Sequence, residues 1–153
     1  MSGSRGFSLT DLLVALAIMA TVTALAYPWF MSFVQNARVK AGAQELATVI
    51  NGARQLAIAR NTLVCVTLSG NSAVYRINVS AACAGGTPFV GALTRSDGTI
   101  PLSNAMEISG TTANVVFTNL GAASTAGTYT VRDPATTKTM LVVVAASGRV
   151  TIQ

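Results

Sequence analysis

LLVALAIMATVTALAY, residues 12–27, contains no charged side chain and is almost wholly apolar. Apolar residues extend the stretch on both sides, at 7–9 and at 29–33. A helix needs about 20 such residues to cross the hydrocarbon core of a bilayer. The segment is therefore predicted to enter a membrane. It would do so either as an anchor or as a secretory signal, for which Ala24-Leu25-Ala26 supplies a small-x-small cleavage site.

Helical periodicity continues beyond Pro28. Apolar residues recur at spacings of three and four, at Val39, Ala43, Leu46, Val49, Ile50, Ala53, Leu56 and Ala57. Polar residues between them leave one apolar face. We expect a helix of about 50 residues that begins in the membrane and ends packed on a domain. Pro28 lacks a backbone N–H and is expected to bend this helix or to divide it in two.

The period changes after Arg60-Asn61, and the rest of the chain is rich in strand patterns. Strands are predicted at 62–68 and 73–80, joined by a hairpin turn at 70–72, and at 114–118, 128–131, 140–145 and 149–152. Loops are predicted at 84–88 and 96–98, with a tight turn at Ser147-Gly148. A helix lying on an antiparallel sheet is the simplest way to bury both apolar faces. The predicted fold class is α+β, with a long N-terminal helix packed on a small antiparallel β-sheet head.

The two cysteines, Cys65 and Cys83, bear on the compartment. An even number of cysteines favours a disulfide in an exported protein, whereas two free buried thiols are the alternative in a cytosolic one. A disulfide closing this loop would stabilise the head by about 3 kcal/mol. Arg5 precedes the apolar stretch while Arg38 and Lys40 follow it, so the flanking charges leave the orientation open. The cysteine pair favours a C-terminal part outside the cytoplasm.

Asp11 lies inside the apolar run. A carboxylate costs up to about 2.5–3.5 kcal/mol at mid-membrane and less near the membrane edge. A plain anchor or a secretory signal gains nothing from this residue. Either Asp11 reaches the membrane edge, or a cation from another molecule pairs with it.

Residues 6–11, GFSLTD, resemble the processing motif of type IV prepilins, in which a short basic leader ends in glycine. The resemblance implies that a prepilin peptidase cuts between Gly6 and Phe7 and methylates the new amine of Phe7. It also implies that Asp11 pairs with this amine in a neighbouring subunit and sets the register of assembly. Asp11 stands where the family typically has glutamate, one methylene longer. Pro28 matches the family's helix-bending proline.

Shorter matches resemble the FimT/FimU and GspH group of minor pilins and pseudopilins. They lie at 36–38, 45–46, 53–57, 64–65, 117–121 and 148–150. The resemblance implies a pilin-like division into a prepilin leader (1–6), a membrane-inserted or filament-core helix (7–33), an amphipathic helix packing on the head (34–61) and a periplasmic β-rich head (62–153). It implies a single-pass protein of the bacterial inner membrane with its head in the periplasm, and it leaves open incorporation in an extracellular pilus. The implied partners are other pilins or pseudopilins through the N-terminal helix, the prepilin peptidase and the inner-membrane assembly platform.

The sequence offers no enzyme, cofactor site or metal site. It has no histidine, so a Ser-His-acid or Cys-His arrangement cannot be built. Two cysteines without histidine do not make a zinc site. Asp97, Glu107 and Asp133 are single acids whose spacing does not pair them, and Gly85-Gly86 lacks the lysine of a phosphate-binding loop.

The leading interpretation is a structural subunit that assembles into or primes a type IV pilus or a type II secretion pseudopilus. One alternative is a DNA-binding minor pilin for natural transformation. Some FimT-like proteins bind DNA through C-terminal arginines, and this chain keeps Gly148-Arg149 but has Thr151 at the next arginine position. Arg149 alone would contact one phosphate. Another alternative is a secreted soluble domain with a conventional signal peptide.

Overall fold

The computed structural model describes residues 8–92, 94–102, 106–110 and 114–153. Within these residues, helix α1 (Leu9–Arg60) is followed by ten short strands. The chain forms two compact units that meet inside α1, residues 1–35 and residues 36–153. The second of these is the head unit. The predicted long N-terminal helix is confirmed.

Helix α1 ends where the sequence changes period. Asn61 adopts a left-handed backbone conformation, with φ of +50°, which asparagine tolerates better than most residues. The amide of Thr62 donates to the carbonyl of Ala57 (3.2 Å), and the amide of Asn61 donates to that of Ile58 (3.3 Å). These two bonds form a Schellman cap, which satisfies carbonyls of the last helical turn.

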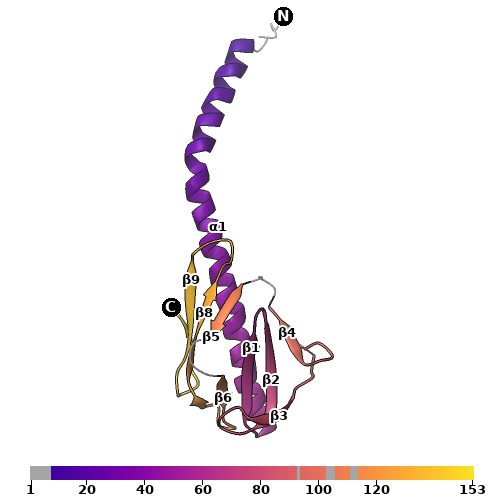
Figure 1. The fold of residues 1–153 in the computed structure, drawn as a ribbon. Coiled ribbons are helices and arrows are strands. Elements are labelled where there is room, and N and C mark those ends of the chain that lie inside the picture. Colours follow the sequence, from indigo (N-terminus) through magenta and orange to yellow (C-terminus); the bar gives the residue numbers. More distant parts are fainter. Residues whose placement is uncertain (1–7, 93, 103–105, 111–113) are drawn as a thin grey trace, which may run out of the picture. The chain divides into compact units, whose positions relative to one another are not determined.

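Two antiparallel sheets follow (Figure 1). The first has the strand order β3-β2-β1-β6-β7, with β4 also paired to β2. Its strands are β1 (Val64–Ser69), β2 (Ser72–Val79), β3 (Gly85–Pro88), β4 (Thr99–Pro101), β6 (Val115–Phe117) and β7 (Ala123–Thr125). The second has the order β10-β9-β8-β5, with β5 (Glu107–Gly110), β8 (Gly127–Arg132), β9 (Thr139–Val144) and β10 (Val150–Ile152).

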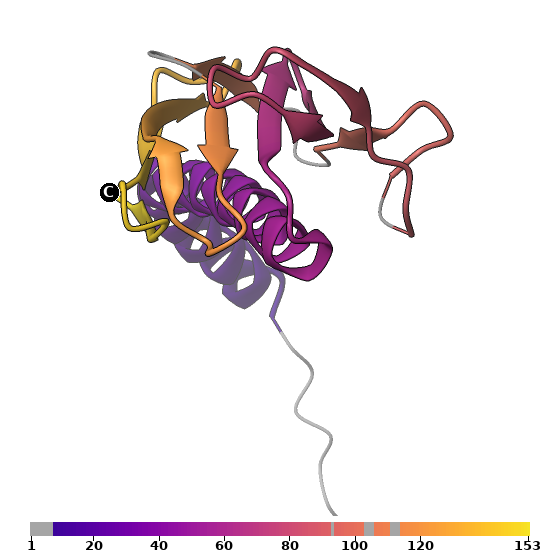
Figure 2. The same cartoon turned by 90° about the horizontal axis from the view of Figure 1, so that it is seen from below.

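The core of the head unit lies between α1 and both sheets. Strands of the two sheets arch over one side of the helix (Figure 2). The helix buries Val39, Gly42, Ala43, Leu46, Ile50, Ala53 and Ala57. The strands contribute buried side chains that include Val64, Val66, Val115, Phe117, Val131, Val142 and Val144. The apolar face predicted from helical spacing is thus the face that packs on the sheets.

Tyr75 joins the first sheet to the middle of α1. It is 6% exposed, and its hydroxyl donates to the carbonyl of Val49 at 2.5 Å. Gly52 makes room for this hydroxyl, because a Cβ there would lie 2.8 Å from the Tyr75 oxygen. Burial raises the pKa of Tyr75 from 10.0 to about 12. The neutral phenol is therefore part of the helix–sheet contact.

Two glycines let two turns close against α1 at its C-terminal end. A Cβ at Gly121 would lie 2.9 Å from Ile58 Cδ1 and 3.0 Å from Arg54 Nε. A Cβ at Gly148 would collide with the carbonyl oxygen of Gly121 and lie 3.3 Å from Arg54 Nε. Asn119 of the same β6–β7 turn donates its side-chain amide to Asn61 Oδ1 at 2.8 Å. Both turns are thereby held against the end of the helix.

The structure corrects the predicted sheet in three respects. The head contains two sheets rather than one. The segment predicted as a loop at 84–88 contains the edge strand β3, which pairs with β2 at Ile77↔Thr87 and Val79↔Gly85. The strands β4, β5 and β7 were not predicted. All four are three or four residues long and are too short for an alternating pattern. β3 and β4 pair with the longer strand β2, β5 pairs with β8, and β7 pairs with β6, so each takes its conformation from a partner strand.

We expect the free energy of unfolding of the full chain in nonionic detergent to fall between about pH 10 and about pH 12. The Tyr75 pKa is raised in the folded state. The stability that the neutral Tyr75 phenol contributes is therefore fully present below the unfolded pKa and is lost as the pH rises through the folded pKa. Tyr75→Phe should cost about 1 kcal/mol at neutral pH and flatten this fall. Burial also raises the Tyr129 pKa, so a smaller slope should remain. Urea titrations across this range measure the slope, and equal slopes in the two proteins would contradict the assignment.

Gly148→Ala should destabilise the head by about 2–4 kcal/mol, because alanine adds a left-handed backbone penalty to a steric collision. Gly148 has φ of +80°, and its Cβ would meet the Gly121 carbonyl. Gly70→Ala is the matched control: Gly70 has φ of +59° with no atom within 4 Å of its Cβ position. The control should lose only about 1–2 kcal/mol. Equal losses in urea unfolding would show that the contact at Gly148 is unimportant.

Candidate functional site

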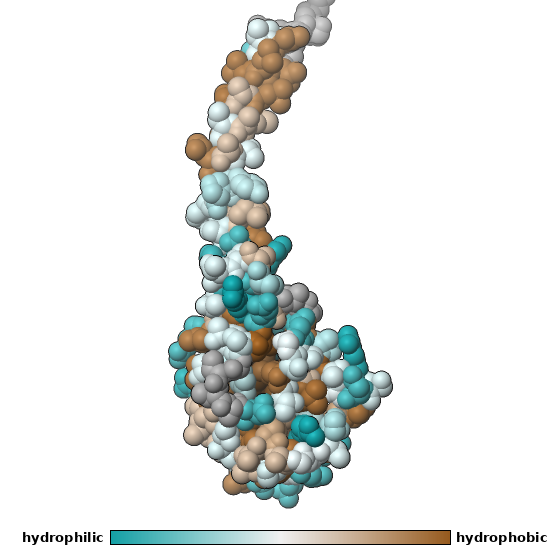
Figure 3. All heavy atoms as spheres, viewed as in Figure 1, coloured by the Kyte–Doolittle hydropathy of each residue, from teal (hydrophilic) through white to brown (hydrophobic). Residues whose placement is uncertain are grey.

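The N-terminal half of α1 presents an apolar surface on all sides. Its large apolar side chains from Leu9 to Phe33 are at least 37% exposed. A window of 18 residues in this helix reaches a mean hydropathy of 2.1, and among the described residues α1 is the one helix long and apolar enough to cross a membrane. A signal sequence or a buried core helix can satisfy the same criterion, but none of this window is buried. Figure 3 shows the brown apolar surface along this part of the helix. Such a surface is typical of a membrane or partner contact.

Three hydroxyl groups of this half donate to carbonyls within the helix. Thr21 donates to the carbonyl of Ile18 (2.8 Å), and Thr23 donates to that of Met19 (2.7 Å). Ser32 donates to the carbonyl of Trp29 at 3.2 Å. A helix whose polar groups are bonded internally can be placed in hydrocarbon at low cost.

Pro28 lies inside α1, and the residues on both sides of it are helical. The alternative of two separate helices is therefore wrong. Pro28 has no N–H to donate to the carbonyl four residues before it, at Ala24. Its role in bending the helix during assembly stays a prediction.

Asp11 lies in the first turn of α1 with its side chain exposed. The carbonyl of Ser8 accepts from the amides of Asp11 (3.1 Å) and Leu12 (3.3 Å), and the Ser8 hydroxyl is 2.7 Å from the Thr10 hydroxyl. An acid in the first turn is favourable beside the unpaired amides of a helix N-terminus. The carboxylate is accessible to a second molecule. Gly6 and Phe7, the predicted processing residues, lie outside the described residues.

The predicted disulfide between Cys65 and Cys83 is present, with 5.6 Å between the two Cα atoms. It ties the buried strand β1 to the turn between β2 and β3. Cys65 is fully buried, whereas Cys83 is partly accessible. The disulfide therefore holds the end of the first sheet in place, and it is a structural element rather than a reactive site.

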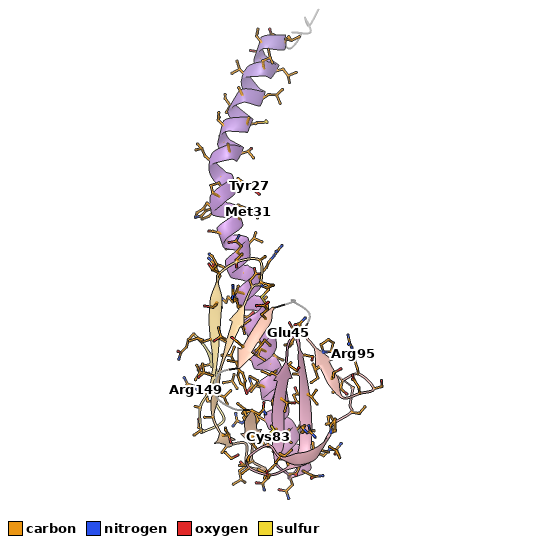
Figure 4. The ribbon with its side chains drawn as sticks, in the orientation of Figure 1. Tyr27, Met31, Glu45, Cys83, Arg95 and Arg149 are labelled. Atoms are coloured by element: carbon orange, nitrogen blue, oxygen red, sulfur yellow. A yellow bond between two sulfur atoms is a disulfide. The ribbon has the colours of Figure 1, made fainter. Side chains whose placement is uncertain are left out.

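Arg149 is exposed in the turn between β9 and β10, where its carbonyl accepts from the amide of Ala145 at 2.9 Å. In Figure 4, Arg149 and Arg95 lie on opposite sides of the head. A nucleic-acid contact by Arg149 stays a prediction.

The acidic side chains of the head take part in local structure. Asp97 Oδ1 accepts from the Thr99 hydroxyl (2.6 Å) and amide (3.0 Å), and these bonds lower the Asp97 pKa. Asp133 is 4% exposed, and its Oδ1 accepts from the amide of Ala135 at 3.0 Å. Glu107 stands opposite Arg132 in the β5–β8 register. Among the described residues, no group of three or more Cys, Asp or Glu side chains could hold a metal ion.

An open groove of about 340 Å³ lies between α1 and the first sheet. Its lining includes Gly52, Leu56, Tyr75 and Phe89. The Tyr75 hydroxyl is already bonded to the helix backbone. The groove thus offers apolar surface and no general acid–base pair.

Sequence reasoning missed two features of the head. The matches at 53–57, 117–121 and 148–150 come together in space, because Arg54 packs beside Gly121 and Gly148. The second feature is the contact between Lys138 and Asn36, whose side chains are 2.7 Å apart. No local pattern points to this contact, because the two residues are 102 positions apart in the chain.

Comparison with known proteins gives the family and the fold. Residues 42–148 match the family described as type II transport protein GspH. The solved structure of the type IV minor pilin FimU from Pseudomonas aeruginosa strain PAO1 is 17% identical, covering 79% of this chain and 92% of its own, with a TM-score of 0.55. The solution structure of GspH from E. coli is 12% identical, covering 77% and 89%, with a TM-score of 0.60. No curated protein matches the chain.

The two solved structures confirm the predicted pilin-like α+β fold, a long N-terminal helix packed on antiparallel strands. The family match extends over most of the chain, from the packed half of α1 to the β9–β10 turn. The chain belongs to the GspH family, and the resemblance to the FimT/FimU–GspH group of minor pilins and pseudopilins is confirmed.

Proposed function

We propose that the chain is a membrane-anchored structural subunit, a minor pilin or pseudopilin, that assembles into or primes a type IV pilus or a type II secretion pseudopilus. The observation that carries this proposal is one helix with two different halves. Its first half exposes apolar side chains on all sides, and its second half buries one face in a head of the GspH family.

The apolar first half of α1 needs a non-aqueous environment both before and after assembly. Each large apolar side chain left in water costs about 1.5–3 kcal/mol relative to burial. A membrane can cover this surface before assembly, and the equivalent helices of other pilins or pseudopilins can cover it in a filament. The same surface thereby serves both as anchor and as assembly interface.

The division of the chain follows the predicted one. We assign residues 1–6 to a leader, 7–33 to the membrane-inserted helix, 34–61 to the packing helix and 62–153 to a β-rich head on the periplasmic side of the inner membrane. The disulfide supports an oxidising compartment for the head. Partners of the N-terminal segment are the prepilin peptidase and the assembly platform. We assign the chain no catalytic role.

Asp11 is the proposed registration residue. Its carboxylate is exposed near the start of α1, and burial in a filament core would require a cation beside it. The amine of a processed Phe7 on a neighbouring subunit is the proposed cation. The aspartate side chain is one methylene shorter than that of glutamate. The α1 helices of the two neighbouring subunits must therefore lie closer together for the carboxylate to reach the amine.

Processing is tested by the intact mass and N-terminal sequence of the membrane-extracted protein. We expect a chain that begins at Phe7 and carries one additional methyl group. Gly6→Val should block the cut because the side chain occupies the cleavage position, whereas the control Gly3→Val in the same leader should leave it unchanged. A chain beginning at Tyr27 would identify a conventional secretory signal and would overturn the filament proposal.

Asp11→Asn should reduce the amount of this subunit in sheared filaments or in the pseudopilus fraction at least about tenfold, because the partner amine loses its counter-charge. Asp11→Glu should retain most of the incorporation, and Asp97→Asn, a substitution in the head, should retain all of it. Immunoblots of the filament and membrane fractions measure the ratio. Normal incorporation of the Asp11→Asn protein would remove the registration role.

A further inference from the structure

A group of cations marks the place where the apolar part of α1 ends. Residues 12–37 contain no charged side chain, and Arg38 and Lys40 are the first charges after them. At about 1.5 Å per residue, this charge-free helix is about 40 Å long, close to the thickness of a bilayer with its headgroups. When the helix spans a membrane, Arg38 and Lys40 therefore fall at the level of the lipid headgroups.

Within the head unit, the two cations lie on opposite flanks of the packed helix face. Both side chains are exposed, while Val39 between them is 2% exposed and faces the sheets. Residues 38 and 40 are separated by about 200° around the helix axis. Neither side chain is directed into the core, so both are available to groups that surround the helix.

The second sheet adds a third cation at the same level. Lys138 precedes β9, in the turn that connects it to β8, and its Nζ donates to Asn36 Oδ1 at 2.7 Å. Asn36 lies half a turn before Arg38, so this bond places the ammonium beside the same helical turn. We call Arg38, Lys40 and Lys138 the cationic collar. In Figure 3 a teal, hydrophilic band follows the brown surface along α1.

Two acidic residues of the second-sheet region have their own neighbours within that sheet or its turns. Asp133, in the same turn as Lys138, is buried and accepts from a backbone amide. Glu107 stands opposite Arg132, a fourth cation, in the β5–β8 register. The collar itself consists of two exposed basic side chains on α1 and the Lys138 ammonium.

We propose that the cationic collar binds the phosphodiester headgroups of anionic phospholipids at the membrane surface. This inference rests on the proposed insertion of α1. Lys and Arg form charge-assisted hydrogen bonds with phosphate oxygens, and basic residues next to a membrane segment are attracted to anionic lipid. The collar holds the head unit at the membrane surface, and a subunit that leaves the bilayer for a filament breaks these contacts.

The single tryptophan, Trp29, provides the probe. It is 76% exposed on α1, nine residues before Arg38. The full chain is reconstituted in phosphatidylcholine vesicles in which about one fifth of the lipid is phosphatidylglycerol. Bromine atoms, which quench tryptophan fluorescence on contact, are placed on the acyl chains of either phosphatidylglycerol or an equal fraction of phosphatidylcholine. Quenching then reports which lipid surrounds the helix.

We expect brominated phosphatidylglycerol to quench Trp29 at least about twofold more than brominated phosphatidylcholine at the same fraction. The preference should disappear in Arg38→Gln/Lys40→Gln, decrease in Lys138→Gln, and weaken at about 1 M salt, where the screening length is about 3 Å. The control Arg95→Gln/Arg149→Gln removes the same charge elsewhere on the head and should keep the preference. Equal quenching by both lipids in the wild-type chain, or an unchanged preference in Arg38→Gln/Lys40→Gln, would overturn the proposal.

Vesicles made wholly of brominated phosphatidylcholine test the insertion itself. Strong quenching there with no lipid preference would overturn the collar alone and leave the anchored subunit intact. Absence of quenching there would mean that Trp29 does not enter the bilayer, and it would overturn both the membrane anchor and the collar.

Discussion

The packing of one helical stripe against two sheets is the contact on which the head depends. From Val39 to Ala57 the stripe uses small or branched side chains, so the strands approach the helix closely. Val64, Val66 and Phe117 from the first sheet and Val131, Val142 and Val144 from the second meet the same stripe. The two sheets share a core only because α1 lies under both of them. Disruption of this stripe would therefore affect the whole head rather than one sheet.

The same helix must satisfy two different solvents. Its first half has Thr21 and Thr23 hydroxyl groups bonded within the helix and, beyond Asp11, no charged side chain up to residue 37, as a bilayer or a bundle of like helices requires. Its second half is amphipathic, with charges beginning at Arg38. The change between the two patterns marks the end of the proposed membrane segment along the chain. The head can therefore fold in water, whereas the apolar first half of α1 needs a membrane or other helices to cover it.

Several contacts in the head depend on glycines, where the absence of a side chain lets other groups come close to the backbone. Gly52 admits the Tyr75 hydroxyl to a helix carbonyl, and Gly121 and Gly148 bring two turns together beside Arg54. The disulfide of Cys65 and Cys83 acts at the end of the first sheet, where short edge strands bury little apolar surface. The close glycine contacts and the disulfide add stability to a small domain, which can bury only a limited apolar core.

The sequence by itself determined the length and two-part character of α1, its packed face, the longer strands and the GspH-type family, because periodicity and local motifs are properties of neighbouring residues. It could not determine the edge strands β3, β4, β5 and β7 or the division into two sheets, because such strands take their conformation from a partner strand. Only the tertiary structure brought Arg54 to Gly121 and Gly148, and Lys138 to Asn36. These pairs are distant in the chain, and their proximity follows from how the sheets fold back onto the helix.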